Sequence, residues 1–188
     1  TELTAEERRH GLGSACDHAV LKMRQVARRH EHVFTKLAAF IAEGNSLVLV
    51  RGNHDLDFHW ETARAAFVDA LLERLPDVPL EERQLGRDGL TGRVEFQPWF
   101  YYVTGLLYVE HGHQWDSLCN YSSPLAPMSP GDSTRLDWSF ADLLLRHIVR
   151  PTPGLSVDSH DELGVGYYVK FGISLGIRGA ARLAARGG

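Results

Sequence analysis

The chain has 188 residues and a formal net charge of −4, and its length suits a single domain over residues 1–188. Hydrophobic residues make up 44% and charged residues 23%, a balance that excludes a disordered chain. The acidic balance argues against a protein that binds nucleic acid through bulk positive charge. No apolar run is long enough for a membrane span, and two cysteines are too few for a disulfide framework. We therefore expect a globular protein of a reducing compartment, the cytoplasm.

The first part of the chain predicts a helix, a strand and a loop in succession. Apolar residues recur at steps of three and four from Asp17 to Glu43, which predicts an amphipathic helix. Ser46–Val50 is a continuous aliphatic run, typical of a strand that is buried on both faces. Arg51–Asp55 follows as a loop at the carboxyl end of this strand, where open α/β sheets bind ligands. Asp57 and His59 come next; they could line the mouth of a pocket, but an ordinary solvated loop is the favoured reading.

The rest of the chain predicts further helices and strands, and so an α/β protein. The apolar residues of Trp60–Leu75 recur with helical spacing. Val94–Val103 and Leu106–Glu110 resemble the two strands of a hairpin, with Pro98 at an edge or a bulge. The remaining expectations are a surface connection over Pro76–Gly92, a loop over Ser122–Ser133 and a helix over Leu136–Val149.

The loop Arg51–Asp55 carries side chains that suit phosphate chemistry. Gly52 permits close approach of the backbone to a ligand, and Asn53 offers a neutral oxygen to a cation. His54 can donate a proton to a leaving oxygen, and Asp55 can orient the imidazole. The plainer alternative is a polar turn with a salt-bridged histidine. Arg51 could contact a substrate phosphate or pair with a carboxylate, and the sequence favours neither.

A second polar segment, Glu110–Asp116, follows the second strand of the expected hairpin. Imidazole nitrogens suit zinc, manganese or iron, so His111 and His113 are candidate metal ligands. In an extended chain the two rings would face the same side, but Gly112 makes that geometry uncertain. The alternative is a histidine pair on a hydrated loop. Two strand-end clusters of metal-compatible residues weigh more than either cluster alone.

A strand followed by Gly52-Asn53-His54-Asp55, then a helix, then a strand that ends in His111-Gly112, resembles the calcineurin-like metallophosphoesterases. The segment is most similar to their bacterial branch of UDP-diacylglucosamine pyrophosphatases, in which Gln-aromatic-Asp often follows the second motif. The resemblance runs from about Asp17 to Asn120. It implies an α/β fold in which a two-sheet β-sandwich is flanked by helices.

The resemblance also implies a reaction and a set of roles. The reaction is hydrolysis of a phosphoester or pyrophosphate bond by attack of a metal-activated hydroxide, with two divalent ions of manganese, iron or zinc. The substrate is expected to be a phosphorylated small molecule or a lipid-linked compound. The expected site residues are Asn53, His111 and His113 as metal ligands, His54 and Asp55 as catalytic groups, and Arg51 and Asn120 as substrate contacts.

Two of five family motifs are present in the chain. The family pattern also has an Asp-x-His and a Gly-Asp-x-x-Asp before the first long helix, and a Gly-His-x-His in the C-terminal part of the domain. None of these three motifs is found at the corresponding place in this chain. We therefore expect a central fragment of a longer domain, incomplete at both ends. The alternative function is a catalytically inactive homologue or fragment that serves as a binding or structural module. A nuclease of the same family is a third reading, which the acidic balance disfavours.

The tail Leu163–Gly188 is basic and apolar. Arg178, Arg182 and Arg186 are spaced by four, so a helix would place them on one side. Such a segment predicts a peripheral contact with an anionic membrane surface. The alternative, which the glycines of the tail favour, is a helix packed on the core with a solvated arginine edge.

Overall fold

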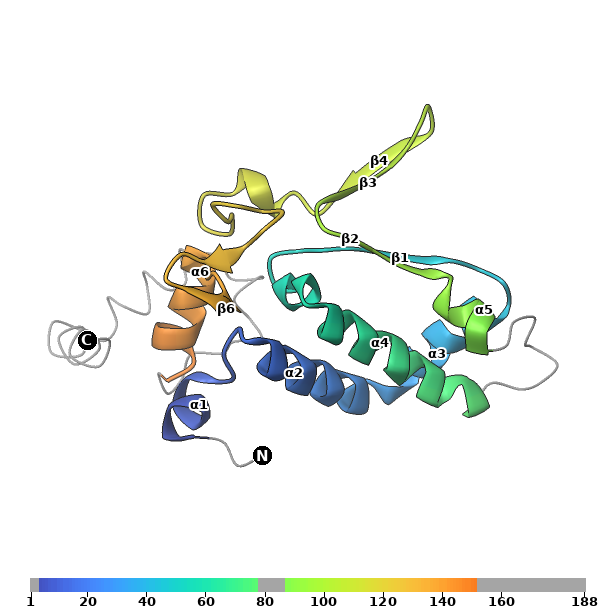
Figure 1. The fold of residues 1–188 in the computed structure, drawn as a ribbon, viewed down its shortest axis with the longest axis horizontal. Coiled ribbons are helices and arrows are strands. Elements are labelled where there is room, and N and C mark those ends of the chain that lie inside the picture. The colour runs from blue at the N-terminus through green and yellow to red at the C-terminus, as the bar shows by residue number, and fades with distance from the viewer. Residues whose placement is uncertain (1–3, 78–86, 152–188) are drawn as a thin grey trace, which may run out of the picture. The chain divides into compact units, whose positions relative to one another are not determined.

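The computed structural model describes residues 4–77 and 87–151 (Figure 1). Its mixture of helices and small sheets confirms the predicted α/β class. The chain divides into two compact units, one formed by Gly13–Ser139 and the other by Thr1–Leu12 together with Phe140–Gly188. The larger unit contains both polar motifs, so most of the description concerns it.

Two helices, α2 (Cys16–Arg29) and α3 (Glu31–Ala42), replace the single helix predicted from Asp17 to Glu43. The helical path breaks at His30, whose backbone has φ −115° and ψ 39°. The apolar stripe continues across the break, because Met23 on α2 and Phe34 on α3 are both buried. The break therefore lets two shorter helices each turn an apolar side towards α4 (Glu61–Arg74), the helix expected over Trp60–Leu75.

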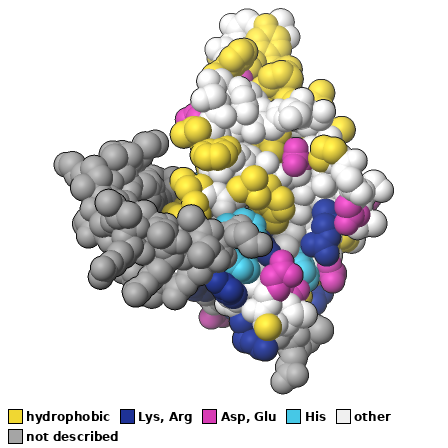
Figure 2. Space-filling view, turned by 90° about the vertical axis from the view of Figure 1, so that its left-hand side faces the viewer, with side chains coloured by type: hydrophobic (Ala, Val, Ile, Leu, Met, Phe, Trp, Pro, Cys, Tyr) yellow, Lys and Arg dark blue, Asp and Glu magenta, His cyan; other side chains and the backbone are white. Residues whose placement is uncertain are grey.

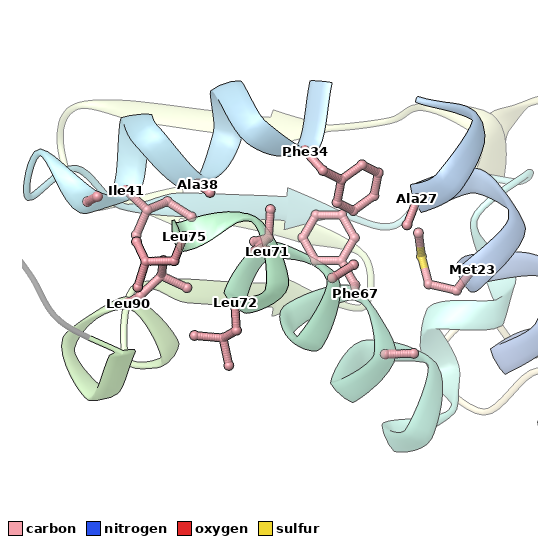
Figure 3. Close-up of a cluster of buried hydrophobic side chains, with 13 residues drawn as sticks. Met23, Ala27, Phe34, Ala38, Ile41, Phe67, Leu71, Leu72, Leu75 and Leu90 are labelled. Atoms are coloured by element: carbon pink, nitrogen blue, oxygen red, sulfur yellow. The ribbon is translucent and has the colours of Figure 1, made fainter. Parts of the chain in front are cut away.

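Strand β1 (Leu47–Val50) pairs in parallel with β2 (Val94–Gln97), in a register that sets Leu47 opposite Val94. The sequence predicts that β1 is buried on both faces, but all four residues are half-buried. In the described part of the chain β1 pairs with β2 alone, which leaves one edge of β1 without a neighbouring strand. The core lies between this strand pair and α2, α3 and α4 (Figure 3). Its large members are Met23, Phe34, Ile41, Phe67, Leu71, Leu72, Leu75 and Leu90.

A short helix, α5 (Arg87–Thr91), lies in the segment predicted as a surface connection over Pro76–Gly92. Leu90 on this helix is fully buried in the core with Ile41 and Leu75 (Figure 3). The prediction of a surface connection was therefore wrong at this position, because one apolar side chain among charged neighbours gives too weak a periodic signal. A 3-10 helix, Leu75–Asp77, extends α4 at the other side of the connection.

The predicted hairpin forms, but its first strand is shorter than expected. Pro98 and Trp99 separate β2 from β3 (Phe100–Val103), and β3 pairs antiparallel with β4 (Leu107–Glu110). Gly105 takes a left-handed φ of +71° in the turn between them. The hairpin extends away from β1 and β2 (Figure 1). Hydrophobic side chains also gather in the upper part of the molecule on the face shown in Figure 2. Its exposed apolar residues are Phe100, Tyr102, Leu106, Leu107, Tyr108 and Val109.

Two short strands, β5 (Met128–Ser129) and β6 (Asp132–Leu136), pair antiparallel; β5 lies within the predicted loop Ser122–Ser133, and β6 begins in it and runs beyond its end. Leu136 at the end of β6 is buried in a second small cluster with Leu56 and Tyr121. Leu56 opens a 3-10 helix, Leu56–His59, directly after the first polar motif. This second cluster therefore anchors the loop that carries the motif.

The smaller unit contains α1 (Ala5–His10), α6 (Phe140–Leu144) and a π-helix, Leu145–Val149. Thr4 and Glu7 form a capping box at the start of α1. The predicted helix over Leu136–Val149 begins only at Phe140, because Leu136 belongs to β6. Among the described residues, none of the helices has the length and hydrophobicity that a membrane crossing requires. The predicted basic tail, Leu163–Gly188, lies outside the described residues.

Candidate functional site

The first polar motif forms a loop at the carboxyl edge of the parallel pair. The backbone N–H of Arg51 donates to the carbonyl of Gln97 at 2.9 Å, so the ladder of β1 and β2 continues to the first residue of the loop. Arg51, Gly52 and Asn53 are buried, whereas His54 and Asp55 are exposed. The strand pair thus fixes the start of the loop, and its end faces solvent.

The second polar motif reaches this loop at Gly52. A β-carbon added to Gly52 would lie 2.6 Å from Cδ2 and 2.7 Å from Nε2 of His111. The same β-carbon would lie 3.1 Å from Oδ2 of Asp55. The imidazole of His111 and the carboxylate of Asp55 therefore share the space over Gly52, and only glycine leaves room for this approach.

His111 and His113 lie together because the backbone turns at the glycine between them. Gly112 has a left-handed φ of +85° and precedes the 3-10 helix His113–Trp115. The two imidazole centroids are 5.2 Å apart at an interplanar angle of 68°. His111 is exposed, whereas His113 is buried with its ring 6.0 Å from that of Tyr121.

Asn53 is held by a residue that follows the second motif. The hydroxyl of Tyr121 donates to the backbone carbonyl of Asn53 at 2.8 Å, in a buried position. Tyr121 in turn packs in the cluster with Leu56 and Leu136. This bond ties the loop of the first motif to the segment after the second. Asn120, the predicted substrate contact, is exposed beside it, and its backbone N–H donates to the carbonyl of Asp116.

His54 and Asp55 line a largely apolar cavity of about 640 Å³. Its walls come from α2, α3, β1 and α4. Asp57 also lines this cavity and forms an ion pair of 2.5 Å with Lys22. The favoured reading of a solvated loop was therefore wrong for Asp57, which lines a cavity, as the alternative reading had it, and is tied to α2. The two exposed candidate catalytic residues, His54 and Asp55, thus lie at the edge of a cavity that is lined mainly by apolar side chains.

Among the residues that the structure describes, Arg51 has no carboxylate partner, one of the two possibilities that the sequence left open. It is 5% exposed, and its Nη2 donates to the backbone carbonyl of Pro124. Burial lowers the pKa of Arg51; the nearby Tyr121 acts in the opposite direction, and the positive charge of Arg64 lowers this pKa further. Burial also lowers the pKa of His59, and the charges of Arg51 and Arg64 add to that effect.

Arg64 is a residue near the loop that sequence reasoning did not identify, whereas His59 was placed at the mouth of a pocket as the less favoured reading. His59 was expected in solvent but is half-buried in the 3-10 helix after the motif. Arg64 lies on the first turn of α4, and its Nη1 donates to the carbonyls of Phe58 and His59 at 2.9 Å each. The short spacing between the motif and the start of α4 is the signal that could have suggested that Arg64 lies near the loop.

The side chains near Gly52 carry atoms of the types that bind a divalent cation. Asn53 has an amide oxygen, and His111 and His113 have imidazole nitrogens, a mixed set that fits manganese, iron or zinc. Within residues 4–77 and 87–151, no three side chains of the types His, Cys, Asp and Glu come together in a metal-binding group. Glu110 is engaged elsewhere, since hydrogen bonds from Trp115 and Tyr108 lower the pKa of its carboxyl.

Comparison with known proteins gives one result. The model of the calcineurin-like phosphoesterase family matches residues 16–179, a span that contains both polar motifs. No curated protein and no solved structure gave a significant match to the chain.

Proposed function

The chain belongs to the calcineurin-like phosphoesterase family, and from this premise we propose that it hydrolyses a phosphoester or pyrophosphate bond with divalent cations. The observation that carries the proposal is the contact of His111 with Gly52. Two motifs far apart in the sequence meet there, and each brings groups that serve phosphoryl transfer. A turn with an isolated salt-bridged histidine would not need this contact.

Asn53, His111 and His113 are the residues that would hold a cation. When bound, divalent cations stabilise the charge that develops on phosphoryl oxygens and lower the pKa of the attacking water. The buried Tyr121 hydroxyl fixes the backbone of Asn53, and packing against Tyr121 orients the ring of His113. Both supports act as the outer contacts that hold metal ligands in place.

His54 is the proposed proton donor. Water attacks phosphorus, the bond from phosphorus to the leaving oxygen breaks, and His54 supplies a proton to that oxygen. Asp55 is the proposed support of His54, and its carboxylate lies over Gly52 beside His111. The exposure of His54 and Asp55 leaves both accessible to a substrate that enters from solvent. Asn120, also exposed, is the proposed contact to the rest of the substrate.

A lipid-linked diphosphate is the finer form of the proposal. It follows from the resemblance to UDP-diacylglucosamine pyrophosphatases, and the apolar cavity beside His54 and Asp55 supports it. A peripheral membrane contact through Arg178, Arg182 and Arg186 belongs to the same proposal. Sedimentation of the full-length protein with anionic and with neutral vesicles tests the contact. If replacing the three arginines by glutamine does not reduce binding to anionic vesicles, the tail is not the membrane contact.

Two single variants test the assignment of roles. Asn53→Ala is expected to reduce the metal content, whereas His54→Ala retains metal and lowers turnover by about 10²–10⁴-fold. Metal content is measured by mass spectrometry, and turnover with a panel of phosphodiesters, phosphomonoesters and pyrophosphates. Equal loss of metal in both variants would contradict this assignment of roles. If the metal-loaded full-length protein turned over no substrate of the panel, the inactive binding module would be the better description.

A further inference from the structure

A second cleft, of about 600 Å³, adjoins the loop on the side of Arg51. A cavity of this size fits a small organic ligand. Three basic side chains line it: Arg51 from the loop, His59 from the 3-10 helix and Arg64 from α4. Leu49 and Phe96 contribute apolar surface from the two paired strands. The cleft thus combines cationic and apolar walls.

In the described part of the chain, the two arginines of this cleft have no acidic partner. Neither guanidinium forms an ion pair with any residue in 4–77 or 87–151, although Arg51 is almost fully buried. Glu95, an exposed residue, also lines the cleft; its carboxylate accepts a hydrogen bond from the side-chain amide of Gln97 and forms no ion pair with either arginine. A buried charge is costly unless it is compensated, and here the neighbouring charge of Arg64 adds to the cost. A bound anion would supply the compensation.

Backbone acceptors hold both arginines in position. Arg51 donates to the carbonyl of Pro124, and one nitrogen of Arg64 donates to the carbonyls of Phe58 and His59. Each guanidinium has five N–H donors, so most of them remain for a ligand. A planar fork that is fixed in this way matches two oxygens of one phosphoryl group.

We propose that this cleft binds a second phosphoryl group of the substrate, the one that is not attacked, through Arg51, Arg64 and His59. The apolar wall of Leu49 and Phe96 then accommodates the organic group attached to it. Arg51 is two residues from Asn53, so their α-carbons are within about 7.6 Å and the cleft adjoins the loop that carries the proposed metal ligand. The inference rests on the proposed function and narrows its substrate class to organic compounds with two phosphoryl groups.

Calorimetric titration of inorganic pyrophosphate into the whole, metal-free chain tests the cleft separately from catalysis. Arg64→Gln is expected to weaken binding by at least about tenfold, the loss of one charge-assisted contact. Arg24→Gln is the matched control, since it removes the same charge from an exposed position on α2 outside the cleft. This control is expected to stay within about twofold of the unmodified chain.

Two results of the titration would overturn the inference. Equal losses in Arg64→Gln and Arg24→Gln would mean that only the overall charge attracts pyrophosphate. Absence of binding by the unmodified chain at low salt would remove the site altogether. If circular dichroism shows that Arg64→Gln does not fold, Arg64→Lys replaces it, with binding weaker than in the unmodified chain because the fork is lost.

A kinetic comparison extends the test to substrates once metal is restored. Arg64→Gln is expected to raise KM for ADP, which has two phosphoryl groups, and to leave KM for p-nitrophenyl phosphate unchanged. Equal increases for both compounds would contradict the proposed subsite. If the chain hydrolysed neither compound, the proposed function would fail, while the calorimetric result would still decide whether the cleft binds pyrophosphate.

Discussion

The imidazole of His111 lies against Gly52, with Cδ2 only 2.6 Å from the position that a β-carbon of residue 52 would take. This contact joins the loop after β1 to the end of β4, two elements that share no strand pairing in the described residues. The absence of a side chain at Gly52 is therefore as much a part of the site as the histidine that lies over it. The site also gains a carboxylate there, since Asp55 approaches the same point.

Replacement of Gly52 by alanine is expected to displace the His111 ring and weaken metal binding by about 10–100-fold, the range for lost support of a ligand. The fold should be affected much less, because an exposed ring can move away. Metal content and a denaturation curve measure the two effects. Gly131→Ala is the control, since nothing lies within 4 Å of a β-carbon at that position. Full metal content in Gly52→Ala would contradict the role of the contact.

His111→Ala is expected to lower mainly the metal content, whereas His113→Ala is expected to lower mainly the stability of the fold. His111 is exposed, so its loss should remove metal and change the free energy of unfolding by no more than about 0.5 kcal/mol. His113 is buried against Tyr121, so its truncation should cost about 1–3 kcal/mol. Metal stoichiometry and urea denaturation give both numbers. A normal metal count in the first variant with a deficit in the second would assign the main ligation to His113.

Removal of the Tyr121 hydroxyl is expected to destabilise the fold by about 1–3 kcal/mol, because Tyr121→Phe leaves the buried carbonyl of Asn53 without this donor. Tyr102→Phe serves as the control, since the Tyr102 side chain is 57% exposed. The free energies of unfolding are compared by chemical denaturation. If the two variants are equally stable, the bond between Tyr121 and Asn53 contributes nothing measurable.

The stability of the fold should depend on pH through His59. Burial and the charges of Arg51 and Arg64 lower its pKa in the folded chain below the ordinary value of 6.5. As pH falls below that value, the unfolded chain binds a proton at His59 that the folded chain does not, so the free energy of unfolding decreases. His59→Gln is expected to show a shallower decrease between about pH 7 and pH 5. Parallel profiles for the two proteins would show that His59 does not contribute.

Local signals in the sequence were sufficient to predict the two loops of the site and the strands that precede them. An aliphatic strand before Arg51 and a hairpin before His111 both exist, and the family model covers both motifs. The contact between Gly52 and His111 could be expected only by analogy, because no local pattern measures the distance between two loops. The substrate role of Asn120 stays a prediction.

Other features depend on tertiary packing and could not be predicted from local patterns. The break at His30 occurs within a continuous helical pattern, and it is explained only by the contacts of α2 and α3 with α4. Leu90 is an isolated apolar residue that proved to be buried in the core. Arg64 lies on α4, and the spacing of the apolar residues of this helix predicted which side is buried but not that Arg64 contacts the loop. In each case the decisive partner is distant in the sequence.

The β3–β4 hairpin has a consequence for the handling of the protein in solution. From Phe100 to Val109 it contains no charged residue, and Leu106 at its turn is 75% exposed. Natural edge strands usually carry lysines, prolines or bulges that prevent pairing with another molecule, and this hairpin has none of them in its strands. It is therefore the segment at which concentrated samples should first aggregate, and a gatekeeper lysine at position 106 should raise the solubility limit.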